Sequence, residues 1–152
     1  NINEWSQGGN KEIKDKRINN IENVPTVDIH MKQIGFRKQW ESIINTYISK
    51  LVSHLYSPFK TSGLNIAFVV KYEMGNQEHL NPHHDSSAYS INITLNTPDV
   101  DFTGGGTRFI KQDVSVQGKK GWATIHPGRL THYHEGLPIT RGKRLIFVSF
   151  VN

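Results

Sequence analysis

His83 and Asp85 stand two positions apart in the segment Asn-Pro-His-His-Asp-Ser-Ser that runs from residue 81 to residue 87. On an extended chain, side chains two residues apart point to the same side. The imidazole and the carboxylate would therefore converge on one point, as two ligands of a divalent metal ion would. Histidine and aspartate are also common in turns and loops, so this pair needs a third ligand from elsewhere in the chain.

The third ligand is expected about 50 residues downstream, because six of the eight histidines lie between positions 79 and 134. The candidates are His126, His132 and His134. His132 and His134 have the same parity, so a strand could direct both to the interior. His126 precedes Pro127, and a structural hydrogen bond at a turn is its simpler role. Two imidazoles and one carboxylate that leave coordination sites open are the ligand set of non-haem Fe(II) oxygenases.

Arg144 follows His134 by ten residues and is expected to open the last apolar strand. An arginine beside a metal site suits one task well, the bidentate binding of a carboxylate. Arg141 stands between Thr140 and Gly142 and is expected in the preceding turn. The combination of a histidine pair, a carboxylate and Arg144 predicts an oxygenase that uses 2-oxoglutarate, whose far carboxylate would meet the arginine.

The composition limits the alternatives. A chain of 152 residues without cysteine forms one domain of ordinary size and must hold metal through nitrogen and oxygen ligands. No apolar run reaches the roughly 18 residues of a transmembrane helix. The net charge of +5 is not concentrated in one basic stretch, so nucleic-acid binding is the least favoured function. We expect an N-terminal arm over residues 1–23 and an oxygenase domain over 24–152, the C-terminal fragment of a longer protein.

The periodicity predicts one helix followed by many short strands. A helix is expected from position 36 to 57, where Pro58 stops it, and its apolar residues recur with a 3.6-residue period in one stripe that should cover a sheet. The stripe consists of Phe36, Trp40, Ile43, Ile44, Tyr47, Ile48, Leu51, Val52 and Leu55. Before the helix, a strand is expected over 24–31. After it, strands are expected over 66–72, 89–96, 107–111, 121–126, 130–134 and 144–151. This order favours a mainly β fold with a helical buttress, a jelly roll or double-stranded β-helix.

Two details of these strands bear on a site. Asp28 and His30 share parity in the first strand, and a solvent-facing pair at a sheet edge is the simpler interpretation. In the strand over 89–96, one face is apolar and should meet the helix, whereas Ser90 and Asn92 belong to a polar face that could line a pocket. The three glycines from Gly104 onward predict either a close backbone approach or a flexible loop tip.

Five segments resemble the catalytic domain of procollagen lysyl hydroxylases, and the similarity runs from about residue 5 to residue 151. They are Glu-Asn-Val-Pro-Thr-Val-Asp-Ile-His-Met at 22–31, Phe-Val-Val-Lys-Tyr at 68–72, Pro-His-His-Asp-Ser-Ser at 82–87, Gly-Gly-Gly-Thr-Arg-Phe at 104–109 and His-Pro-Gly-Arg-Leu-Thr-His-Tyr-His-Glu-Gly-Leu-Pro at 126–138. The resemblance implies that His83, Asp85 and His134 hold Fe(II). It also implies that Arg144 anchors 2-oxoglutarate, with help from Tyr72 and Asn92.

The same resemblance implies the reaction and its setting. The substrate would be lysine in collagen or a collagen-like peptide, hydroxylated at carbon 5 with O₂ while 2-oxoglutarate becomes succinate and CO₂, and ascorbate would assist. A homodimer in the endoplasmic reticulum lumen is implied. Departures such as Ile21 and Thr107 suggest a divergent member, from a giant virus for example. A prolyl hydroxylase and a non-catalytic metal- or sugar-binding jelly roll remain the alternatives. Because the substrate is cationic, we expect an acidic patch near the site, drawn from Asp28, Asp99, Asp101 and Glu135.

Overall fold

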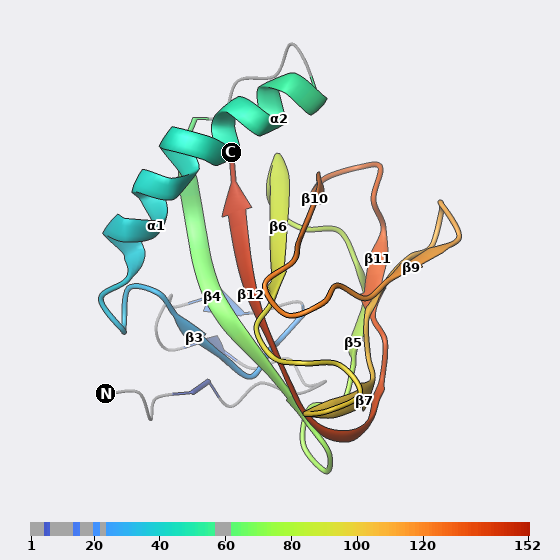
Figure 1. Cartoon of the computed structure of the whole chain (residues 1–152). Helices are drawn as coiled ribbons and strands as arrows, with labels where there is room; N and C mark the ends of the chain where they lie inside the picture. Colours follow the sequence, from blue (N-terminus) through green and yellow to red (C-terminus); the bar gives the residue numbers. More distant parts are fainter. Residues whose placement is uncertain (1–4, 7–13, 16–19, 22–23, 57–61) are drawn as a thin grey trace.

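The computed structural model describes residues 5–6, 14–15, 20–21, 24–56 and 62–152, which form one helix, two large antiparallel sheets and a small two-stranded sheet (Figure 1). Most of the expected arm over 1–23, and the helix stop at Pro58, lie outside the described residues. Within the arm, β1 (Lys14–Asp15) pairs with β2 (Asn20–Ile21). Trp5 contacts the domain, because the Lys71 ammonium lies 4.9 Å from the centre of its ring.

The larger sheet has the strand order β10-β6-β12-β4-β3, with β7 also paired to β12. Its strands are β3 (Asp28–His30), β4 (Leu64–Glu73), β6 (Tyr89–Thr94), β7 (Phe102–Gly104), β10 (Ala123–Pro127) and β12 (Ile139–Val151). The long strands β4 and β12 pair from Leu64 opposite Val151 to Glu73 opposite Lys143 and form the backbone of the fold.

The smaller sheet has the order β5-β11-β8-β9. Its strands are β5 (Leu80–His83), β8 (Thr107–Phe109), β9 (Val114–Val116) and β11 (His134–Gly136). Both sheets place strands side by side that are far apart in the sequence, such as β4 with β12 and β5 with β11, so that His83 is paired with His134. The expected jelly roll with a helical buttress is confirmed, and no helix among the described residues is long and apolar enough to cross a membrane.

The predicted helix is confirmed but contains a wide turn. It consists of α1 (Arg37–Ile43), the π-helical η1 (Ile44–Ile48) and α2 (Ser49–Leu55). A π-turn adds a residue to the turn, and residues four apart therefore stay in line: Trp40, Ile44 and Val52 are buried and Ile48 is half-buried. The prediction of one covered stripe is wrong for four of its residues, which are exposed: Phe36, Tyr47, Leu51 and Leu55.

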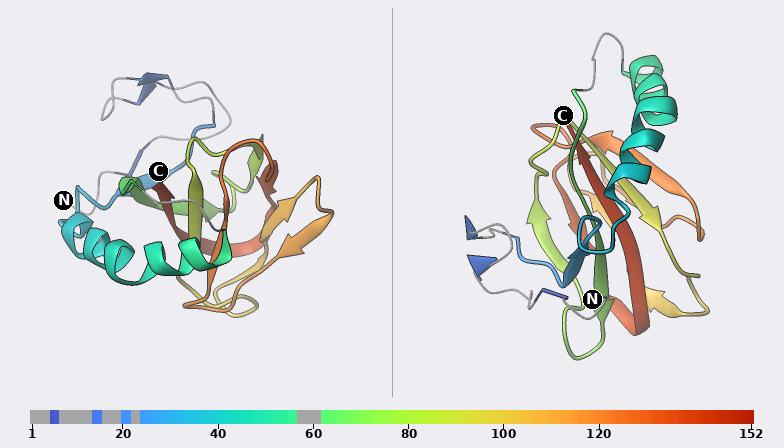
Figure 2. Two further views of the ribbon diagram at one scale, coloured as in Figure 1. Left: turned by 90° about the horizontal axis from the view of Figure 1, so that it is seen from above. Right: turned by 90° about the vertical axis from the view of Figure 1, so that its left-hand side faces the viewer.

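The two faces of the larger sheet have different roles. The helix runs along one face (Figure 2), where Trp40 and Ile44 pack with Ala67, Ile91 and Phe147. The Trp40 indole also donates a hydrogen bond of 2.8 Å to the hydroxyl of Ser149 on β12. The opposite face meets the smaller sheet and lines a cavity of about 480 Å³. The predicted division of β6 holds, because Ile91 faces the helix and Asn92 lines the cavity.

Three predicted features are wrong in detail. The strand expected over 130–134 begins only at His134, because residues 130–133 form bends and coil. The last strand begins at Ile139 rather than at Arg144, and Arg141 is an exposed residue within it rather than part of a turn. The pair Asp28 and His30 does not face solvent: Asp28 is 2% exposed, and both residues line the cavity.

Candidate metal centre

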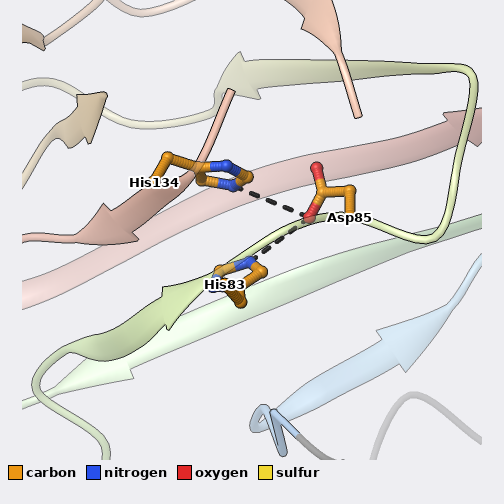
Figure 3. A group of neighbouring side chains, drawn as sticks. All are labelled: His83, Asp85 and His134. Atoms are coloured by element: carbon orange, nitrogen blue, oxygen red, sulfur yellow. Dashed lines mark ion pairs between the residues drawn. The ribbon is translucent and has the colours of Figure 1, made fainter. Parts of the chain in front are cut away.

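Two adjacent strands of the smaller sheet bring His83, Asp85 and His134 together. His83 is the last residue of β5, His134 is the first of β11, and the two are partners in the strand pairing. Asp85 Oδ1 lies 3.2 Å from His83 Nε2 and 3.6 Å from His134 Nε2 (Figure 3). The three ligand atoms lie within 4.8 Å of one another. We call these three residues the triad.

Both triad histidines are held in the same tautomer by backbone carbonyls. His83 Nδ1 lies 2.7 Å from the carbonyl oxygen of Asn81, and His134 Nδ1 lies 2.8 Å from that of His132. A carbonyl oxygen only accepts hydrogen bonds, so each Nδ1 carries a proton, and in the neutral ring each Nε2 presents a lone pair toward Asp85. This orientation is the one that metal-ligating histidines adopt.

The second carboxylate oxygen of Asp85 is also held. The Ser90 hydroxyl donates a short hydrogen bond to Oδ2, which leaves Oδ1 directed at the two imidazoles. The Asp85 amide donates to the carbonyl of Gly128 at 3.2 Å. A Cβ at Gly128 would stand 3.2 Å from Asp85 Cβ and clash with Ser87, so the position after Pro127 requires glycine.

The charges of the triad suit a cation. Burial opposes ionisation of Asp85, but without metal the hydrogen bond from protonated His83, the charge of protonated His134 and the Ser90 hydroxyl together lower its pKa. Burial lowers the pKa of His134. For His83, burial is outweighed by the hydrogen bonds to Asp85 and Asn81, which raise its pKa. A buried carboxylate and two aligned Nε2 lone pairs form a three-ligand set for a divalent metal that leaves coordination sites free.

Arg144 lies on β12, two residues before Ile146, and therefore on the face of the larger sheet that lines the cavity. It is opposite Tyr72 in the pairing of β12 with β4. It is 5% exposed, and its guanidinium carbon lies 5.2 Å from the centre of the Tyr72 ring. One guanidinium nitrogen donates a hydrogen bond of 3.4 Å to the Gly106 carbonyl. The glycine run after β7 is a close backbone approach, because a Cβ at Gly105 would lie 3.0 Å from Arg144 Cδ.

Tyr72 connects Arg144 with the triad. Burial raises the pKa of Tyr72, the charge of Arg144 lowers it and the charge of Asp85 raises it further, so both charged groups lie within electrostatic reach of one phenol. Tyr72 lines the cavity together with the triad, and Arg144, which is not among the residues that line it, packs against Tyr72. Asn92 lines the same cavity, and its Oδ1 is buried without a hydrogen-bond partner among the described residues.

The other candidate histidines lie outside the triad. His132 is in the coil before β11, and its ring lies 5.5 Å from that of Phe109. His126 makes the expected structural hydrogen bond, since its Nδ1 lies 2.9 Å from the Pro127 carbonyl. The sequence did not predict that His126 Nε2 would stand 4.0 Å from Asp85 Oδ2, buried and without a hydrogen-bond partner among the described residues. Burial lowers the pKa of His126 to about 4.

The chain is similar to known proteins over nearly all of its length. Residues 61–152 match the 2OG-Fe(II) oxygenase superfamily. The chain is 51% identical over 152 residues to human "Procollagen-lysine,2-oxoglutarate 5-dioxygenase 1", which covers 98% of this chain and 20% of that protein. It is 49% identical over 149 residues to "Procollagen lysyl hydroxylase and glycosyltransferase" of Acanthamoeba polyphaga mimivirus, covering 97% of this chain and 16% of that protein. The chain thus spans a fifth or less of the length of these relatives.

Solved structures of low identity have the same fold. A Burkholderia pseudomallei oxidoreductase of the 2OG-Fe(II) oxygenase family superposes with a TM-score of 0.68 at 12% identity, over 98% of this chain and 72% of the other. A viral collagen prolyl hydroxylase from Paramecium Bursaria Chlorella virus-1 superposes with a TM-score of 0.54 at 17% identity, over 83% and 78% of the two chains.

Proposed function

Because the chain belongs to the 2OG-Fe(II) oxygenase superfamily, we propose that it is the catalytic part of a hydroxylase that converts peptidyl lysine to 5-hydroxylysine. One observation carries the proposal: two imidazoles and a carboxylate converge on one point in a cavity of about 480 Å³. The choice of lysine is supported by the identity of about one half to lysine hydroxylases of an animal and a virus.

In this proposal, His83 Nε2, Asp85 Oδ1 and His134 Nε2 hold Fe(II). The fit rests on this chain's own hydrogen bonds: carbonyls fix both Nδ1 protons, and Ser90 occupies the other carboxylate oxygen. Bound iron supplies the oxidation, in which one O₂ and one 2-oxoglutarate yield succinate, CO₂ and one oxygen atom transferred to the substrate. The protein fixes the three ligand atoms, leaves the remaining positions open to the cavity and keeps its walls largely apolar.

Arg144 is the proposed anchor of 2-oxoglutarate. A buried guanidinium gains most from a carboxylate that binds it with two hydrogen bonds. Tyr72 packs against Arg144 and lies within reach of the charge of Asp85, so its hydroxyl is placed to orient a dicarboxylate that extends from one to the other. Asn92 adds an amide with an unpartnered oxygen on the same wall. Shorter acids would leave Arg144 without a carboxylate partner.

The finer assignments follow from the relatives and are part of the proposal. The peptide substrate is a collagen-like sequence, because the similar proteins are named procollagen hydroxylases. Ascorbate is the reductant that keeps the metal in the ferrous state. A homodimer and an endoplasmic reticulum setting are predictions that rest on the resemblance to procollagen lysyl hydroxylases.

The proposal is tested by succinate release from the purified chain with Fe(II), ascorbate and 2-oxoglutarate. Three conditions are compared: no peptide, an Xaa-Lys-Gly collagen peptide and a peptide with proline in place of lysine. We expect stimulation by the lysine peptide alone. Stimulation by the proline peptide alone would favour a prolyl hydroxylase. An absence of succinate despite stoichiometric iron binding would favour a metal-binding jelly roll without turnover.

A further inference from the structure

The cavity extends well beyond the triad, toward the edge strand β3. Strand β3 pairs with β4, and β4 pairs with β12, so the residues of one row stand side by side across the sheet. Asp28 is opposite Val70, which is opposite Ile146. All three line the cavity, as do Phe68 and Val148 in the next row. An apolar wall therefore runs from the centre of the larger sheet to a carboxylate at its edge.

Asp28 is built into this wall. It is 2% exposed, the Thr26 hydroxyl donates a hydrogen bond of 2.5 Å to its Oδ2, and His30 Nε2 lies 3.5 Å from its Oδ1. Its backbone is fixed from the outer side, since the Asp28 amide donates to the hydroxyl of Ser6 at 2.9 Å. The carboxylate is thus oriented before any ligand binds, which reduces the entropy lost on binding.

Among the described residues that line the cavity, the carboxylates are Asp28 and Asp85. Asp85 belongs to the triad, which leaves Asp28 for another role. The other acidic residues expected near the site do not line the cavity. Asp99 and Asp101 are exposed, and Glu135 lies 3.8 Å from the guanidinium of Arg108.

We propose that Asp28 is a specificity-determining residue that binds the ε-ammonium group of the substrate lysine. The assignment rests on the proposed function and deepens it. A lysine side chain has an apolar stem and a cationic end. The wall of the cavity matches both parts, because Phe68 and Val70 offer an apolar surface to the stem and Asp28 offers a carboxylate to the cationic end. The net charge of +5 disfavours a cationic substrate in general, so a local buried carboxylate is needed to select one.

The test measures peptide binding rather than turnover. Calorimetry without O₂, on the chain loaded with Fe(II) and 2-oxoglutarate, compares an Xaa-Lys-Gly peptide with one whose lysine ammonium is replaced by a neutral hydroxyl. The wild-type chain should bind the lysine peptide at least about tenfold more tightly. In Asp28→Asn this preference should fall to about twofold or less, because the amide keeps the shape and loses the charge.

Asp99→Asn is the matched control, since it neutralises an exposed carboxylate outside the cavity and should leave the preference unchanged. Asp28→Ser replaces Asp28→Asn if the latter does not fold, as judged by thermal melting. An unchanged preference in a folded Asp28 variant overturns the assignment. If that chain still releases succinate with the lysine peptide, the proposed function stands. A wild-type chain that neither binds the lysine peptide nor turns over overturns both.

Discussion

His83 and His134, 51 residues apart in sequence, are direct partners in the pairing of β5 with β11, and their ring centres lie 4.4 Å apart. The backbone ladder of the smaller sheet therefore sets the spacing of the two imidazoles. Asp85 follows β5 by two residues and completes the triad from the same segment. A metal ion bound here would tie β5 to β11 and stabilise the folded chain by its binding free energy.

Ser90→Ala removes the hydroxyl that holds Asp85 Oδ2. Without this donor the carboxylate loses its orientation, and we expect the affinity for Mn(II), a redox-stable substitute for Fe(II), to fall by about 10- to 100-fold. Calorimetry on the metal-free protein measures this directly. Ser115→Ala, at an exposed position of β9, is the control. Equal affinities of the two variants would contradict a supporting role for Ser90.

Arg144→Lys keeps the positive charge but removes the planar pair of donors. We expect the KM for 2-oxoglutarate to rise by about 10- to 100-fold, because a single ammonium cannot replace a bidentate contact. Arg141→Lys changes an exposed arginine three residues earlier in the same strand and should leave KM unchanged. A KM that responds equally to both substitutions would remove Arg144 from the 2-oxoglutarate site.

The stability of the metal-free chain should fall with acid because of His126. Burial lowers the pKa of His126 from 6.5 to about 4 in the folded state. The unfolded chain binds this proton near pH 6.5, whereas the folded chain stays neutral until about pH 4. The contribution of His126 to stability is therefore complete above pH 6.5 and is lost as the pH falls toward 4. The slope is up to about 1.4 kcal/mol per pH unit.

Urea unfolding between pH 7.5 and 4.5 measures this slope, and His126→Asn should reduce it while retaining a donor for the Pro127 carbonyl. The comparison isolates His126 from the ionisable groups of the triad, which the wild-type chain and the variant both retain. His54→Gln, on the exposed side of α2, should leave the slope as it is. A slope that persists in His126→Asn would show that another group causes it.

The helix should depend on Trp40 and not on Tyr47, although one apolar period contains both. Trp40→Ala removes a 5% exposed indole that packs edge-on against Phe147 and donates a hydrogen bond to Ser149. It should lower the free energy of unfolding by about 3–5 kcal/mol. Tyr47→Ala, at a side chain that is 68% exposed, should cost less than about 0.5 kcal/mol. Urea unfolding at pH 7.5 gives both values. Similar losses of stability in the two variants would contradict the conclusion that Trp40 is on the buried face of the helix and Tyr47 on the exposed face.

Local periodicity was sufficient for the parts of the fold that depend on one segment. The two-residue spacing of His83 and Asp85, the polar side of β6 and the extent of the helix all follow from the geometry of a single strand or helix. The selection of His134 over His132 needed more, because both have the same parity. Only the start of β11 at His134 separates them, and this depends on its pairing with β5 and β8.

Features that depend on how the sheets, the helix and distant loops pack against one another could not be predicted from a single segment of sequence. Alternation places Asp28 and His30 on one face of β3, but it does not say whether that face meets solvent or a second sheet. The π-turn leaves no distinct pattern in the sequence, so the exposure of Tyr47 and Leu51 was missed. The position of His126 beside Asp85 depends on the close approach of Gly128 to Ser87, which joins two distant loops.

The most direct test of the central claim is mass spectrometry of an Xaa-Lys-Gly peptide after incubation with the chain, Fe(II), 2-oxoglutarate and ¹⁸O₂. We predict one added ¹⁸O atom, located on carbon 5 of lysine, and none with Asp85→Ala. Asp113→Asn, which neutralises an exposed carboxylate of similar size, should retain the product. A peptide that is unmodified by the iron-loaded wild-type chain, or oxidised equally by Asp85→Ala, would contradict the account.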